Sequence, residues 1–158
     1  AGIILGRAEV VERLYAHPLM RALRPDKLTL AALAATLQLY ATGQREQLPI
    51  WQMLRPCAED LAQRARAVQQ QVGASPLAIA LSPGQSATGG GSLPGETLPT
   101  TLLVVTHPQR SAEDLASALR SQQPPVVGRI ERDQLLLDLR TVLPDQDALV
   151  IKALQALG

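Results

Sequence analysis

Residues 126–140, with the sequence VVGRIERDQLLLDLR, contain two short apolar runs separated by two polar residues. The runs 126–131 and 134–140 have the length of β-strands, and Arg132 and Asp133 between them are enough for a tight turn. The pattern therefore predicts an antiparallel hairpin. The segments before and after it predict the further strands and helices that pack with this hairpin.

On either side of the hairpin, strand and helix signals alternate. Apolar runs at 77–81 and 101–106 predict two further strands. Ser111 and Asp114 have the spacing of a capping box, which predicts the start of a helix. Another helix is expected over residues 145–157. The order β-β-α-β-β-α predicts an α+β fold in which both helices cover one face of a four-stranded sheet.

Residues 82–99, between the first two strands, are rich in Gly, Ser, Thr and Pro, and predict a long loop. The part from Gly89 to Gly95 could present backbone amides to a phosphate. It lacks the spacing of a phosphate-binding loop, however, so a flexible loop is the favoured interpretation.

The N-terminal part of the chain has a different character. Residues 1–6, AGIILG, predict a strand, and helical spacing follows until Pro18. Asp26 is a good N-cap for a long helix that should stop at Gly43. Two more helices are expected before Gly73. Residues 1–75 are thus predicted to be a helical connector, and residues 76–158 a small α+β domain.

The composition excludes several classes of protein. With 46% hydrophobic and 18% charged residues, the 158-residue chain can bury a core. A net charge of +1 argues against a grip on nucleic acid over the whole surface. The single cysteine, Cys57, excludes an internal disulfide and any multi-cysteine metal site. The sequence contains no apolar run long enough for a membrane span and no signal peptide, so a cytoplasmic location is expected.

Two arginines are the leading candidates for binding chemistry. The basic residues comprise thirteen Arg and two Lys, which reflects either codon preference or a need for planar anion binders. Arg21 and Arg24 are three positions apart, so on a helical turn both guanidinium groups would point the same way and could hold a phosphate. The alternative is a solvated helix face.

Other reactive groups form no recognisable site in the sequence. His17 and His107 lie far apart with no ligand spacing, so no metal is expected. Lys27 and Lys152 are the only possible Schiff-base lysines, and neither lies in a tight turn after a strand.

Three stretches resemble one family: HPLMRALRPDKLTLAALAATL from His17, GGGSLPGETLPT from Gly89, and PPVVGRIERDQLLLDLRTVLPDQD from Pro124. They are similar to segments of the bacterial selenocysteine synthases, the L-seryl-tRNA(Sec) selenium transferases. The resemblance implies the C-terminal part of a fold-type-I enzyme dependent on pyridoxal 5'-phosphate (PLP). It also implies that residues 1–75 include the end of the large cofactor domain, and that the PLP lysine lies upstream. This chain would then contain no cofactor-binding residue and be inactive alone.

The same resemblance implies a reaction and partners for the longer protein. Seryl-tRNA(Sec) would become selenocysteinyl-tRNA(Sec) with selenophosphate as donor, through a PLP-bound dehydroalanyl intermediate, in a homo-oligomeric ring of dimers. Arg21 and Arg24 match the family's arginine pair at the selenium-donor site. Arg140 resembles a small-domain arginine that grips a carboxylate. A related PLP enzyme acting on a small amino acid or sugar acid is the main alternative, and an autonomous binding module is another.

Overall fold

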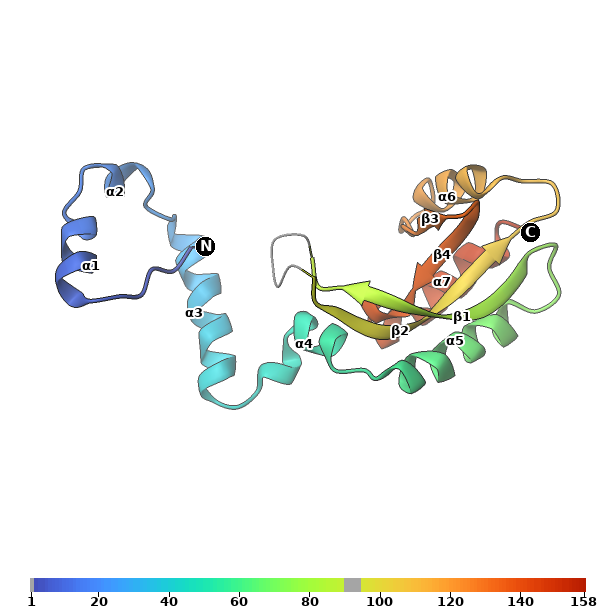
Figure 1. Cartoon of the computed structure of the whole chain (residues 1–158), viewed down its shortest axis with the longest axis horizontal. Coiled ribbons are helices and arrows are strands. Elements are labelled where there is room, and N and C mark those ends of the chain that lie inside the picture. The colour runs from blue at the N-terminus through green and yellow to red at the C-terminus, as the bar shows by residue number, and fades with distance from the viewer. Residues whose placement is uncertain (1, 90–94) are drawn as a thin grey trace. The chain divides into compact units, whose positions relative to one another are not determined.

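The computed structural model describes residues 2–89 and 95–158, and the chain forms two compact units, Ala1–Leu48 and Pro49–Gly158 (Figure 1). The first unit is helical within its described residues, and the second contains a four-stranded antiparallel sheet. Helix and sheet are thus combined as the α+β prediction required.

The first unit consists of three α-helices and one 3-10 turn: α1 (Ala8–Tyr15), α2 (Leu19–Ala22), α3 (Lys27–Ala41) and η1 (Arg45–Gln47). None of these elements contains a buried residue. The predicted strand over residues 1–6 is wrong for the described residues 2–6, which have no regular secondary structure. A strand needs a neighbour to pair its backbone groups, and the described part of this unit contains no other strand.

Helix α3 begins and ends where the sequence predicts. The Asp26 side chain accepts hydrogen bonds from the backbone N–H groups of Leu28 and Thr29, at 2.8 and 3.0 Å, which satisfies two free donors of the first turn. The helix stops before Gly43, whose φ of +72° suits glycine. Its apolar side chains lie in the open: Leu28 is 83% exposed and Leu37 is 50% exposed.

The second unit confirms the predicted order β-β-α-β-β-α. Its elements are α4 (Pro49–Leu54), α5 (Ala58–Val72), β1 (Ala78–Ala87), β2 (Thr97–Thr106), α6 (Ala112–Arg120), β3 (Arg129–Glu131), β4 (Gln134–Asp138), η2 (Leu139–Thr141), η3 (Pro144–Gln146) and α7 (Asp147–Gln155). The strands lie in the order β1-β2-β4-β3. The Ser111–Asp114 capping box at the start of α6 is present in both directions, as predicted.

The hairpin of β1 and β2 is longer than the sequence suggests. Backbone pairing runs from Ala78 opposite Thr106 to Ala87 opposite Thr97, so much of the predicted loop 82–99 is strand. Cross-strand pairing here outweighs the poor strand propensity of Pro and Gly. Residues 90–94 lie outside the described residues.

The second hairpin closes at the predicted turn, but its strands are shorter than predicted: β3 begins at Arg129 and β4 ends at Asp138. Arg132 and Asp133 have φ values of +51° and +58°, so both lie in the left-handed region. Two such residues in succession make the turn whose twist matches that of antiparallel strands. Glu131 and Gln134 are therefore directly paired across the turn.

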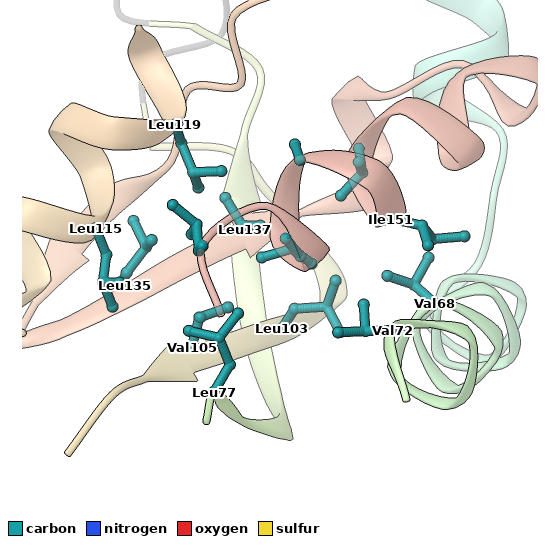
Figure 2. Packing of buried hydrophobic residues seen from close by; sticks show 14 of the residues in the cluster. Val68, Val72, Leu77, Leu103, Val105, Leu115, Leu119, Leu135, Leu137 and Ile151 are labelled. Atoms are coloured by element: carbon teal, nitrogen blue, oxygen red, sulfur yellow. The ribbon is translucent and has the colours of Figure 1, made fainter. Parts of the chain in front are cut away.

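One face of the sheet carries the core. Leu103 and Val105 of β2 and Leu135 and Leu137 of β4 point to this face, where they meet buried side chains from α5, α6 and α7. Figure 2 shows residues of all three helices, including Ile151 of α7, around these strand residues. Each buried aliphatic side chain contributes roughly 1.5 to 3 kcal/mol relative to exposure, so this layer stabilises the second unit.

Helix α5 belongs to the sheet unit. Four side chains spaced along one face of the helix are buried in the main core: Leu61, Ala65, Val68 and Val72. The boundary between compact units therefore falls after Leu48 rather than after residue 75. The division of the longer protein into 1–75 and 76–158 stays a prediction about that protein.

Strand β1 forms one edge of the sheet. Pro83 within it has no backbone N–H, and the Ile79 carbonyl accepts a hydrogen bond from the Gln69 side chain of α5. The edge is therefore interrupted along its length.

Candidate functional site

The segment from His17 to Lys27 carries the two candidate arginines. Nδ1 of His17 accepts a hydrogen bond from the Leu19 N–H at 3.2 Å, beside the start of α2. Helix α2 ends at Ala22, and Arg24 lies in the non-helical stretch before Pro25, because a residue before proline is disfavoured in the helical conformation. The expectation that Arg21 and Arg24 share a helical turn is therefore wrong.

Asp26, the carboxylate nearest to this pair in sequence, is engaged elsewhere. Its oxygens accept from the Thr29 hydroxyl at 2.6 Å and from two backbone N–H groups at the start of α3. The hydrogen bond from the Thr29 side chain, followed by that from the Thr29 backbone, lowers the pKa of Asp26. Asp26 thus serves as the helix cap.

Arg21 and Arg24 are both exposed. Among the described residues, neither side chain makes a hydrogen bond or an ion pair. Each guanidinium has five N–H donors and a permanent charge. The segment therefore presents two cations whose donors are available to an oxyanion.

Arg140 has the opposite surroundings. The residue is 5% exposed, and Nη1 donates to the carbonyls of Met53 and Pro56 at 3.1 and 2.9 Å. Nη2 donates to the Pro99 carbonyl at 2.7 Å, and Nε donates to Oγ of Ser86 at 3.2 Å. In this conformation the guanidinium is committed to backbone carbonyls, and its predicted role in carboxylate binding stays a prediction.

A buried polar cluster around Asp138 holds Arg140 in place. The Ser86 hydroxyl donates to one carboxylate oxygen of Asp138 at 2.5 Å, and the Thr100 hydroxyl donates to the other at 2.8 Å. Ser86 and Thr100 are only 6% and 2% exposed. The sequence reasoning missed this cluster. Its signal was a set of polar residues on the sheet face opposite the core, on three adjacent strands.

Arg64 of α5 makes a second clamp. Its Nε and Nη2 donate to the two carboxylate oxygens of Asp147, at 3.0 and 2.5 Å. The same guanidinium donates to the carbonyls of Leu139 and Val142, at 3.1 and 2.9 Å. Arg64 thus ties α5 to η2 and to the start of α7.

The second unit also contains a cavity of about 620 Å³. Its lining includes Val127, Arg129, Asp138 and Leu149. A smaller cavity of about 340 Å³ lies beside His107. Arg21, Arg24 and Arg140 line neither cavity.

The described residues do not fit a bound PLP. Lys27 and Lys152 are exposed and line neither cavity. Within the ranges 2–89 and 95–158, acidic, histidine and cysteine side chains form no group of three suited to a metal ion. In the same ranges the helices are too short or too polar to cross a membrane.

The described residues thus comprise a helical unit with two exposed arginines and a small α+β unit. A family model described as "SelA: L-seryl-tRNA selenium transferase" matches residues 1–143. The chain belongs to this family.

Relatives of the same name support this membership. The chain is 44% identical over its full length to the L-seryl-tRNA(Sec) selenium transferase of Geotalea uraniireducens, of which it covers 35%. It is 39% identical to that of Aquifex aeolicus, over 99% of the chain and 35% of the relative. It is 43% identical to that of Moorella thermoacetica, over 98% of the chain and 34% of the relative. The chain thus spans about a third of the length of these relatives.

Proposed function

We propose that this chain is part of an enzyme that transfers selenium to seryl-tRNA(Sec), and that Arg21 and Arg24 bind the selenophosphate donor. Family membership supports the reaction. The observation that supports the residues is that both guanidinium groups are exposed and make no hydrogen bond or ion pair within the described part of the chain, while the Asp26 carboxylate caps its own helix. A phosphate oxyanion would find available donors there.

We propose PLP as the cofactor of the longer protein, where it would supply an electron sink for the serine side-chain chemistry. The chain described here contributes no lysine suited to it, so the cofactor lysine is proposed to lie outside these residues. The role left to this chain is to bind the anionic donor and to support that site with the second unit. This chain alone is expected to be inactive.

The partners proposed for the longer protein are seryl-tRNA(Sec), selenophosphate and further copies of itself, in the cytoplasm. The alternative, a related PLP enzyme for a small amino acid or sugar acid, finds less support because the relatives reported above carry the selenium transferase name.

Substitution in the full-length enzyme tests the assignment. Arg21→Ala and Arg24→Ala should each lower kcat/KM for selenophosphate by about 10- to 150-fold, since a hydrogen bond to a charged group contributes about 1.5 to 3 kcal/mol. Arg13→Ala is the matched control, because Arg13 is also exposed and without a described partner, and it should leave turnover unchanged. Near-normal turnover of both test variants at limiting selenophosphate would refute the donor-site assignment.

A further inference from the structure

Helix α4 opens the second unit, directly after Leu48, and its apolar packing is partial, because Trp51, Met53 and Leu54 are only half-buried. None of its residues is buried, and Ile50 is 52% exposed. A six-residue helix has no stability of its own in water. Some other interaction must hold it in place.

Arg140 supplies one such interaction, at the end of the helix. The last carbonyls of a helix have no partner within the helix, and Arg140 donates to two of them, those of Met53 and Leu54, at 3.1 and 3.5 Å. It also donates to the Pro56 carbonyl in the turn toward α5. A cation at a helix C-terminus is favoured by the helix dipole as well.

The guanidinium is itself fixed on the sheet. Its Nε donates to Ser86, which donates in turn to Asp138, so a carboxylate lies one hydroxyl away from the buried charge. The Pro99 carbonyl of β2 accepts from Nη2. Residues of β1, β2 and β4 therefore orient the planar guanidinium group of Arg140 toward α4.

We propose that Arg140 is a latch that holds α4 and the α4–α5 turn on the sheet, and that α4 can open locally while the core of the second unit stays folded. The latch fixes the chain from Pro49 onward, where it arrives from the first unit. The proposal depends only on the contacts of the second unit and not on the proposed selenium transfer.

The chain carries its own reporter for this motion, because Trp51 of α4 is its single tryptophan. In Arg140→Ala we expect acrylamide to quench Trp51 fluorescence at least about twofold more strongly, and the amides of α4 to exchange about tenfold faster or more. Amides of β2 and β4 should keep their wild-type exchange rates. Ethylguanidinium should restore the α4 protection in this variant, and ethylammonium should not, because it lacks the planar fork.

Arg120→Ala is the matched control, since Arg120 pairs with exposed Glu113 and with no other described residue, and it should leave α4 unchanged. Arg140→Lys and Ser86→Ala are measured in parallel, in case Arg140→Ala fails to fold, and both should open α4 to a smaller extent. Unchanged Trp51 quenching in the Arg140 variants would overturn the latch. If the amides of α4 exchanged faster only when those of β2 and β4 did so as well, the latch would also be overturned, because Arg140 would then stabilise the whole unit.

Discussion

Replacing Leu103 by alanine should destabilise the second unit strongly. Leu103 lies on β2, an interior strand of the sheet, is fully buried, and belongs to the core shared with α5, α6 and α7. Removing three carbon atoms costs about 2.4 kcal/mol at about 0.8 kcal/mol each. A residual void of about 60 Å³ adds about 1.5 kcal/mol at roughly 24 cal/mol per Å³. The expected loss is about 4 kcal/mol.

Urea unfolding of the 158-residue chain, followed by hydrogen exchange of β2 and β4 amides, measures this loss. With a slope of about 2 kcal/mol/M, the midpoint should fall by about 2 M while the slope stays constant. Leu28→Ala is the matched control because Leu28 is 83% exposed, and it should change the free energy of unfolding by less than about 0.5 kcal/mol. A loss below about 1.5 kcal/mol for Leu103→Ala, or equal losses for the two variants, would refute this account of the core.

Four further outcomes are expected. Ser111→Ala should cost about 1 kcal/mol in thermal unfolding near pH 7. Because hydrogen bonds from Ser111 lower the pKa of Asp114, the part of the cap in which the Ser111 hydroxyl donates to the Asp114 carboxylate is present above the unfolded-state pKa of about 4 and is lost as the pH falls through the lowered value; a gap from wild type that does not narrow in acid would contradict this. Replacing Arg132 and Asp133 by Asn and Gly should raise the melting temperature, since both positions need positive φ; a fall would show that the turn is set by other contacts. Arg64→Ala should cost about 1.5 to 3 kcal/mol in urea unfolding, because two carbonyls and a carboxylate lose their donor. Borohydride treatment of this chain with PLP should trap no stoichiometric adduct, and a specific adduct on either lysine would oppose the proposed division of the active site.

Local signals in the sequence predicted the features that depend on a few neighbouring residues. The Asp26 cap, the Ser111–Asp114 capping box and the turn at Arg132 were found because each is determined within about four positions. At Cys57 the signal was weaker: its thiol accepts from the Asp60 N–H as an N-cap, a role in which Ser or Asp is more usual.

Features that depend on distant residues were not predictable in this way. The length of the β1–β2 hairpin depends on pairing between two segments of unfavourable composition. The surroundings of Arg140 combine carbonyls and side chains from positions 53 to 138, which no local pattern reports. For the proposed donor site, the two arginines could be identified from the sequence but their backbone conformation could not, because Pro25 acts on the conformation of Arg24.

Pro83 in β1 has a consequence for the behaviour of the protein in concentrated solution. An uninterrupted edge strand of this length would invite another molecule to add a strand of its own, which is a common start of aggregation. An added strand would need a continuous series of free backbone N–H and C=O groups along β1. Pro83 has no N–H, and the Ile79 carbonyl already accepts a hydrogen bond from Gln69, so this series is interrupted. These two interruptions therefore disfavour strand addition along the free edge of the long hairpin.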